Sequence, residues 1–317
     1  MMEQLDGHNS EACLRAADLL CWGKNVIIPS ETVYGLAGLA RSDEGVAGIF
    51  RAKKRPPDNP LIVHVLGKNM AGDLAHIGGL AERLMDKFWP GPLTILLPKR
   101  DDAPLSQLVT AGLPQVALRA PSHTIFRELI AMAGPIAAPS ANPSGAPSPT
   151  RPEHILANPP SHVDAFLAAG ICACGLESTV VEIKEESIII HRPGMVTKEE
   201  LSAMAPTSAL APGAASASPG QRHRHYAPKA SLILNQEAAD QGDFYIAFGP
   251  TSHADFQLSA TGDLAEAAQR LFHGLMEADR VGASKVSVAP IPEEGLGIAI
   301  NERLRRAAEG GKIDVEP

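Results

Sequence analysis

Residues 51–65 read Arg-Ala-Lys-Lys-Arg-Pro-Pro-Asp-Asn-Pro-Leu-Ile-Val-His-Val and join a helix to a strand across a basic turn. Pro56 and Pro57 end the helix, because proline lacks the N–H group that a helix interior requires. The apolar residues that follow, with His64 among them, predict a short buried strand. Positive charge thus stands beside a buried strand end, which is what a triphosphate-binding site requires.

Helices and strands alternate on both sides of this stretch, which is typical of an α/β fold. We expect strands at 26–28, 61–65, 93–97, 116–118, 136–138, 178–183 and 188–191. We expect helices at 10–22, 43–54, 80–88 and 122–133, the first capped by Ser10 and the last by Ser122. Thr197 and Glu200 have the spacing of a capping box and predict one more short helix.

The chain contains 317 residues, a length that favours two domains. From residue 205 to about residue 220 the composition shifts to Ala, Pro, Ser and Gly, which indicates a linker. A second alternating pattern follows, with strands expected near 232–234, 244–247 and 286–289 and helices at 264–279 and 296–308. We therefore predict a larger α/β domain at 1–204, a linker at 205–228 and a small Rossmann-like α/β domain at 229–317.

The composition is that of an ordinary soluble globular protein, with 44% hydrophobic and 20% charged residues. A net charge of -8 and only 4% aromatic residues argue against a broad nucleic-acid surface. We find no apolar run of membrane-spanning length and no signal-peptide pattern at the N-terminus. The four cysteines have neither zinc spacing nor the pattern of a disulfide framework, so we expect a cytoplasmic protein with reduced thiols.

Single residues of the polar segments have ordinary explanations. Lys53 and Arg55 can stabilise a helix C-terminus by about 0.3–1 kcal/mol. His64 can be a core histidine, and Ser140-x-Asn142 can be a simple turn. Taken together, however, five strand ends each present a hydroxyl, an amide or a cation, and an open α/β sheet gathers such ends at one edge.

The expected site contains several cations and hydroxyls but no nucleophile–histidine–acid triad. The sequence also has no Walker-type loop, no GxGxxG motif opening a helix and no metal-ligand cluster. Such a site suits chemistry in which positioning and charge neutralisation dominate, above all displacement at phosphorus.

With these motifs assembled, nearly the whole chain resembles the YrdC-type L-threonylcarbamoyladenylate synthases, in the long form with a C-terminal domain. The resemblance is carried, in order, by Pro29 to Leu36, Lys53-x-Arg55, Asn59 to His64, Trp89-Pro90-Gly91-Pro92-x-Thr94, Arg119-x-Pro121, Pro139 to Gly145, Ser178 to Val181, Arg192-Pro193-Gly194 and His225-Tyr226-x-Pro228. It implies a twisted open mixed sheet that encloses a basic cavity.

The resemblance also implies a reaction of L-threonine, bicarbonate and ATP that yields threonylcarbamoyl-AMP and pyrophosphate, a nucleotidyl transfer that serves tRNA modification next to the anticodon. The threonine-binding residues would be Thr32, His64, Arg119, Ala138 and Ser178. The ATP-binding residues would be Lys53, Arg55, Asn59, Val116, Ser140, Asn142, Ser148, Arg192 and Tyr226.

The resemblance implies that residues 1–204 form the catalytic domain and that Lys53, Arg55 and Arg192 carry the catalysis by neutralising phosphate charge. Magnesium is expected to arrive with ATP rather than in a protein cage. The implied consumer of the product is a tRNA threonylcarbamoyl transferase complex. We expect no membrane association and no stable direct tRNA binding.

Two other functions remain open at this point. A non-catalytic RNA-binding module of the same fold is suggested by Lys53-Lys54-Arg55 and by Arg222 to His225, although the acidic balance disfavours it. Carbamoyl transfer in hydrogenase maturation uses the same domain type, but the acylphosphatase and zinc-finger modules expected there are missing from this sequence.

Overall fold

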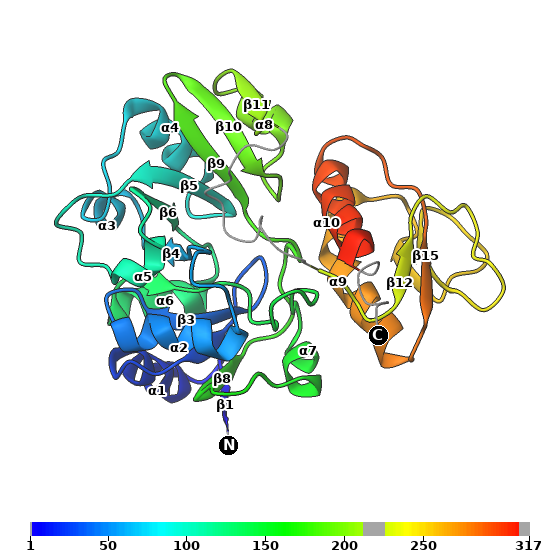
Figure 1. Ribbon diagram of the computed structural model, residues 1–317, viewed down its shortest axis with the longest axis horizontal. Helices are drawn as coiled ribbons and strands as arrows, with labels where there is room; N and C mark the ends of the chain where they lie inside the picture. Colours follow the sequence, from blue (N-terminus) through cyan, green and yellow to red (C-terminus); the bar gives the residue numbers. More distant parts are fainter. Residues whose placement is uncertain (1, 212–225, 311–317) are drawn as a thin grey trace.

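The computed structural model describes residues 2–211 and 226–310, which form two α/β domains (Figure 1). Within those residues, the larger domain is built on an 11-stranded mixed sheet. Its strands, in spatial order, are β1 (Glu3–Asp6), β8 (Ala165–Ala168), β2 (Val26–Ile28), β3 (Gly35–Leu39), β7 (Ile136–Ala137), β4 (Ile62–His64), β6 (Gln115–Arg119), β5 (Leu93–Pro98), β9 (Thr179–Lys184), β10 (Ser187–Arg192) and β11 (Thr207–Ala209).

Helices cover both faces of this sheet. They are α1 (Ser10–Cys21), α2 (Asp43–Lys53), α3 (Lys68–Gly72), α4 (Gly79–Phe88), α5 (Gln107–Thr110), α6 (Thr124–Ala133), α7 (Pro152–Ala157) and α8 (Lys198–Ser202). Successive strand residues point to opposite faces. Val26 and Ile28 therefore pack with α1 and α6, while Ile27 packs in a second cluster with α2 and α4.

Of the three helix N-terminal caps predicted from the sequence, one was confirmed and two were wrong. Thr197 and Glu200 form the expected capping box at α8. The two predicted serine caps were wrong: Asn9 caps α1, and α6 begins at Thr124 with no side-chain cap. Asn9 accepts from the backbone N–H groups of the first turn, which leaves Ser10 as the first helical residue.

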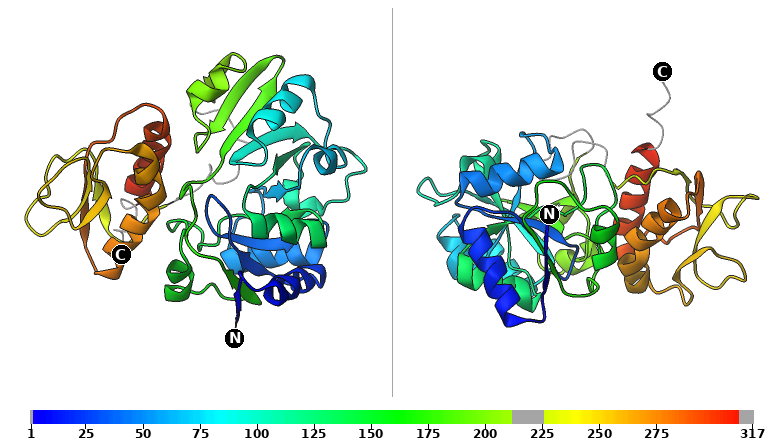
Figure 2. Two further views of the ribbon diagram at one scale, coloured as in Figure 1. Left: turned by 180° about the vertical axis from the view of Figure 1, so that it is seen from behind. Right: turned by 90° about the horizontal axis from the view of Figure 1, so that it is seen from below.

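The smaller domain has a four-stranded parallel sheet in the order β12 (Ser231–Ile233), β15 (Lys285–Val288), β13 (Phe244–Phe248) and β14 (Phe256–Ser259). Its helices are α9 (Leu264–Arg280) and α10 (Leu296–Gly310). Both helices lie between this sheet and the larger domain (Figures 1 and 2). This α/β domain was expected from the sequence, but its two helices share one face of the sheet.

The segment that joins the domains was predicted to begin at residue 205. Thr207–Ala209 instead forms β11, which pairs in parallel with β10 at the edge of the large sheet. Most of the remaining predicted linker falls at 212–225, outside the described residues. In the described part of the chain, no helix is long and apolar enough to cross a membrane.

The two domains pack against each other through α9 and α10. A side chain at Gly175 would come within 2.3 Å of the Cα atom of Gln269 in α9, so only glycine fits at this contact. Gly175 also has a φ of +74°, which glycine adopts without strain. The apolar core of the smaller domain extends across the interface to Val33 and Leu176 of the larger one.

Candidate functional site

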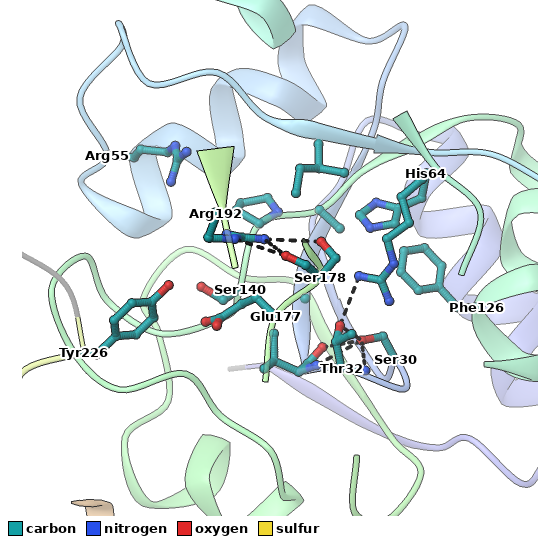
Figure 3. Close-up of a pocket in the computed structure, with 16 residues that line it drawn as sticks. Ser30, Thr32, Arg55, His64, Phe126, Ser140, Glu177, Ser178, Arg192 and Tyr226 are labelled. Atoms are coloured by element: carbon teal, nitrogen blue, oxygen red, sulfur yellow. Dashed lines mark hydrogen bonds between the residues drawn. The ribbon is translucent and has the colours of Figure 1, made fainter. Parts of the chain in front are cut away.

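A cavity opens where several strands of the large sheet end (Figure 3). Its volume is about 60 Å³, whereas one water molecule needs roughly 10–15 Å³. The lining residues are Ser30, Thr32, Val33, Gly35, Arg55, Ile62, His64, Arg119, Phe126, Ala138, Pro139, Ser140, Glu177, Ser178, Arg192 and Tyr226.

Two ends of the cavity can be distinguished (Figure 3). The His64 end contains Ser30, Thr32, His64 and Phe126. The Tyr226 end contains Arg55, Ser140, Glu177 and Tyr226, and Ser178 and Arg192 lie between the two ends.

Arg119 is fixed at the His64 end by three partners. It stands at the end of β6, in register with His64 on the neighbouring parallel strand β4. Its Nη1 donates to Thr32 Oγ1 at 3.0 Å and its Nε donates to the Gly91 carbonyl at 3.3 Å. The cis Trp89–Pro90 peptide lies directly before that glycine.

The third partner of Arg119 is Glu31, which was not among the predicted site residues. Arg119 Nη2 lies 2.6 Å from Glu31 Oε1, and both side chains are at most 8% exposed. The contact is a close ion pair rather than a well-directed hydrogen bond. Burial is the largest effect on the pKa of Glu31 and would raise it, but the charge and contact of Arg119 together with backbone N–H groups, including that of Ser122, lower that pKa overall. The cation of Arg119 is thus held in place by an adjacent carboxylate.

His64 is a neutral, buried imidazole. Desolvation, together with the charge of Arg119, lowers its pKa to about 3. Its Nδ1 lies 3.3 Å from the carbonyl oxygen of Ile136, which can only accept, so this nitrogen carries the proton. The ring also packs on Phe126 with a centroid separation of 4.7 Å. Nε2 is therefore a hydrogen-bond acceptor.

Ser178 connects the two ends. Its hydroxyl lies 2.8 Å from Thr94 Oγ1 and 3.2 Å from Arg192 Nη2. Arg192 also donates to the Ser178 carbonyl from Nε and Nη2. This packing requires Gly194, because a Cβ atom there would lie 2.5 Å from the Glu177 carbonyl oxygen. The Arg-Pro-Gly sequence therefore places the guanidinium of Arg192 against the main chain that precedes β9.

Arg55 lies at the Tyr226 end and is only 8% exposed. Its Nη2 donates to Asn59 Oδ1 at 2.6 Å and to the Pro60 carbonyl at 2.8 Å. Its Nε donates to the Asn59 carbonyl at 3.0 Å. Burial and the nearby charge of Arg192 lower the pKa of Arg55 to about 10, so it stays cationic at neutral pH.

Lys53 does not line the cavity. Its ammonium group donates to the main-chain carbonyls of Ser140 and Asn142, and its side chain is buried. Desolvation and the charge of Arg55 lower its pKa well below the usual value. In this arrangement Lys53 holds the loop at 139–148 in place, and Ser140 of that loop faces the cavity.

Side chains of the C-terminal part of the protein, Tyr226 and Arg303, also take part at the Tyr226 end. Glu177 accepts from Ser148 Oγ at 2.6 Å and from Arg303 Nε at 3.0 Å. The guanidinium carbon of Arg303 lies 5.3 Å from the ring centroid of Tyr226. Tyr226 stacks on Phe272 of α9, also with 5.3 Å between centroids.

The structure brings most of the predicted site residues to this one cavity. All of those predicted for threonine line it, namely Thr32, His64, Arg119, Ala138 and Ser178. Of those predicted for ATP, the lining ones are Arg55, Ser140, Arg192 and Tyr226. The others stand behind the wall: Lys53, Asn59, Val116, Asn142 and Ser148.

Some residues of the site were not predicted. Ser30 and Glu177 line the cavity, whereas Glu31 and Arg303 pair with its lining residues Arg119 and Glu177. Glu31 and Ser30 lie in the polar loop after β2, within the segment Pro29 to Leu36 that carries the family resemblance, but neither side chain was predicted to have a role. Glu177 directly precedes the predicted Ser178, so its position in the sequence was an available signal. Arg303 had no such signal, because it belongs to a regular helix far along the chain.

The RNA-binding alternative depended on an accessible basic cluster. Lys53 is 4% exposed and Arg55 is 8% exposed, and both are bonded inside the protein. The second basic segment, Arg222 to His225, lies outside the described residues. Lys54, the third cation of this cluster, is exposed. With the other two buried, Lys53-Lys54-Arg55 does not present three adjacent cations to RNA.

Comparisons with known proteins cover both domains. The family described as telomere recombination (Sua5, YciO and YrdC) matches residues 18–194. The threonylcarbamoyl-AMP synthase C-terminal domain matches residues 196–309. Threonylcarbamoyl-AMP synthase of Pyrococcus abyssi is 36% identical, over 92% of this chain and 93% of that one. The Bacillus subtilis protein of the same name is also 36% identical, over 96% and 95%.

The fold agrees with these matches. The crystal structure of Pyrococcus abyssi Sua5 complexed with L-threonine superposes with a TM-score of 0.87 at 34% identity, covering 98% of both chains. Escherichia coli YciO matches 61% of this chain at 18% identity with a TM-score of 0.53, which shows the shared fold of the larger domain. The chain therefore belongs to the threonylcarbamoyl-AMP synthase family, in its two-domain form.

Proposed function

We propose that this protein is an L-threonylcarbamoyladenylate synthase, which makes threonylcarbamoyl-AMP and pyrophosphate from L-threonine, bicarbonate and ATP. Membership of an enzyme family across both domains supports the assignment. The observation that carries it is the convergence of Thr32, His64, Arg119 and Ser178 with Arg55 and Arg192 on one cavity. In reaction class the enzyme is a nucleotidyltransferase that serves tRNA modification.

L-Threonine occupies the His64 end in this proposal. Arg119 presents a planar guanidinium, whose fork geometry matches a carboxylate in a way that lysine cannot. The acceptor nitrogen of the neutral His64 is suited to an N–H group or a hydroxyl of the substrate. The hydroxyls of Thr32 and Ser178 supply further partners within the same end.

ATP places its phosphates at the Tyr226 end. Arg55 and Arg192 neutralise the negative charge that develops on pyrophosphate as it leaves. Lys53, Asn59, Asn142 and Ser148 act from behind the wall in this arrangement, by fixing the groups that face the nucleotide. Val116 contributes packing, since it is 1% exposed within the main core.

The chemistry needs little proton transfer from the protein. The amine of threonine and bicarbonate give a carbamate and water. A carbamate oxygen then bonds to the α-phosphorus of ATP while the bond to pyrophosphate breaks, which leaves a mixed anhydride. Positioning the two reactants and excluding water account for most of the rate in such a reaction.

We propose that magnesium enters with ATP. Mg²⁺ keeps several waters and is often bound by substrate phosphates with one or two carboxylates. In the described part of the chain, no group of three or more His, Cys, Asp or Glu side chains is arranged to hold a metal ion. When bound, the ion would supply charge neutralisation to the phosphates.

The product is labile and has to be used by a second enzyme. We propose that this consumer is a tRNA threonylcarbamoyl transferase complex and that the synthase itself binds no tRNA stably. The burial of Lys53 and Arg55, two of the three cations in Lys53-Lys54-Arg55, supports the second part.

A direct assay tests the proposal. Purified full-length protein should release pyrophosphate when given L-threonine, bicarbonate, ATP and magnesium, and mass spectrometry should detect threonylcarbamoyl-AMP. Arg55→Ala should lower kcat/KM for ATP about 100-fold, a loss of roughly 2.7 kcal/mol of transition-state stabilisation. Pyrophosphate release no greater than in a threonine-free control would contradict the proposal.

A further inference from the structure

Glu177 is a carboxylate in a cavity that is proposed to bind the phosphates of ATP. Among the described residues that line the cavity it is the one carboxylate, whereas Arg55, Arg119 and Arg192 are cations. Its side chain is buried, with 6% of the residue exposed. A carboxylate at this position repels phosphate unless another group neutralises it.

That neutralising group comes from the smaller domain. Arg303 of α10 is 0% exposed, and its Nε lies 3.0 Å from Glu177 Oε2. The other carboxylate oxygen, Oε1, accepts from Ser148 at 2.6 Å. Burial alone would raise the pKa of Glu177, but the charges of Arg303 and Arg192 lower it, so the carboxylate is ionised. Both of its oxygens are therefore occupied on the side of the interface.

Arg303 holds two more parts of the same end. Its Nη1 donates to the carbonyl of Pro193 at 2.8 Å, directly after Arg192 in the sequence. Its guanidinium lies over the ring of Tyr226. Glu302 Oε2 accepts from the same Nη1 at 2.6 Å and keeps the guanidinium in orientation. One buried side chain of the C-terminal domain thus contacts Glu177, Tyr226 and the main chain beside Arg192.

We propose that Arg303 is a positioning residue of the nucleotide site: it neutralises Glu177 and holds that carboxylate against the smaller domain, so that the Tyr226 end keeps net positive charge for phosphate. This inference rests on the proposed function, since it takes ATP as the occupant of that end. It gives the C-terminal domain a defined task in nucleotide binding. If Arg303 only held the two domains together, it would make the same contacts, but nucleotide affinity would not depend on the charge of Glu177.

The charge dependence can be tested with the full-length protein and the ATP analogue AMP-PNP, in the presence of magnesium and measured by calorimetry. Arg303→Met keeps the buried apolar stem but removes the cation that pairs with Glu177. We expect this variant to weaken AMP-PNP binding at least about tenfold, because the carboxylate of Glu177 then repels the phosphates of AMP-PNP in a site of low dielectric. The double variant Glu177→Gln with Arg303→Met should return to within about threefold of wild type. L-Threonine affinity should be unchanged in both.

A matched control lies two residues along the same helix. Arg305 is exposed, with 52% of its side chain accessible, and pairs with Glu293 away from the cavity. Arg305→Met should bind AMP-PNP like wild type. Thermal unfolding of each variant shows whether it is folded.

Each result has a defined meaning. If the double variant binds AMP-PNP as weakly as Arg303→Met, the inference is overturned, because removing the charge of Glu177 would not restore a purely structural contact between the domains. Should Arg303→Met fail to fold, the single variant Glu177→Gln tests the inference. We expect it to bind AMP-PNP at least as tightly as wild type. Tenfold weaker binding would show that the carboxylate contacts the nucleotide or its magnesium, and would overturn the inference. Equal binding by wild type and Arg303→Met would also overturn it while leaving the proposed function intact. Wild-type protein that binds no AMP-PNP would overturn the proposed function itself.

Discussion

At the His64 end of the cavity, side chains of a single domain bond to one another, whereas at the Tyr226 end cations bond to main-chain carbonyls and the second domain takes part. Arg119 is held by the carboxylate of Glu31 and the hydroxyl of Thr32. Arg55 and Lys53 donate mostly to carbonyl oxygens. Buried cations are therefore stabilised by a carboxylate and a hydroxyl at the His64 end, and by neutral carbonyl oxygens at the Tyr226 end.

The difference matches the ligands proposed for each end. A small amino acid is recognised by direction, so its partners are fixed in advance by mutual bonds. A triphosphate is recognised chiefly by charge, and Arg55, which donates to neutral carbonyl and amide oxygens, keeps its charge for it. The comparison predicts that substitutions at the His64 end cost mainly stability, and those at the Tyr226 end mainly nucleotide affinity.

The largest effect on stability should follow Arg119→Met. This change leaves Glu31 buried without its cation, and breaking a buried pair costs about 3–5 kcal/mol of unfolding free energy. Threonine-dependent pyrophosphate release should be lost as well. Urea denaturation at neutral pH measures the first effect, and the enzyme assay measures the second.

The control for Arg119→Met is Arg15→Met, which removes an exposed ion pair with Glu3 at about 41% and 42% side-chain exposure. An exposed pair contributes roughly 0–1 kcal/mol. Arg55→Ala should also cost less stability than Arg119→Met, because water in the cavity can satisfy the released carbonyls. Equal destabilisation by Arg119→Met and Arg55→Ala would break the comparison between the two ends.

The sequence predicted the convergence of the site because polar residues at strand ends follow a simple rule of sheet geometry. His64 and Arg119 end adjacent parallel strands, so their proximity needed only correct strand assignments. Several strands without β-branched residues were missed. β3 reads Gly-Leu-Ala-Gly-Leu and β8 reads Ala-Phe-Leu-Ala, and both form because neighbouring strands pair with them.

Contacts that arise only when the domains pack together were out of reach of the sequence. Arg303 belongs to the run Glu-Arg-Leu-Arg-Arg, in which its neighbours Arg305 and Arg306 differ from it only in the direction they face. Its burial follows from the position of α10 against the larger domain. Gly175 is similar, since the Cα atom of Gln269 that excludes a side chain there lies in the other domain.

A smaller effect, in the pH dependence of stability, should follow His64→Gln. The pKa of His64 is about 3 in the folded protein and 6.5 as its ordinary value. As the pH falls below 6.5, the unfolded chain takes up a proton at this residue and the folded protein does not, so His64 lowers stability progressively down to about pH 3. Well above pH 6.5 His64 contributes nothing to the pH dependence of the unfolding free energy.

Removing the imidazole should therefore flatten the dependence of unfolding free energy on pH by about 1 kcal/mol per pH unit between pH 6 and pH 5. Urea denaturation at several pH values provides the measurement. His253→Gln serves as a control, because that side chain is exposed in the folded protein. Parallel slopes for wild type and His64→Gln would show that His64 is not held neutral at the His64 end.

The smallest effect should follow Thr94→Val, which removes one hydroxyl from the connection between the two ends. Thr94 is fully buried, and its Oγ1 lies 2.8 Å from Ser178 Oγ. Valine has nearly the same shape, so the loss is that of one hydrogen bond, about 1 kcal/mol. Ser178 keeps its contact with Arg192 but loses the partner that orients its hydroxyl at the His64 end. The KM for threonine should rise about fivefold, which corresponds to that energy, and the KM for ATP should stay the same.

Thr110→Val is the matched control, because the Oγ1 of Thr110 is buried and has no hydrogen-bond partner among the described residues. It should leave both KM values unchanged and be neutral or slightly stabilising, since a buried hydroxyl without a partner favours the unfolded state. A rise in the KM for ATP with Thr94→Val, with that for threonine constant, would place Ser178 at the Tyr226 end. The boundary between the two ends would then have to be moved across this serine.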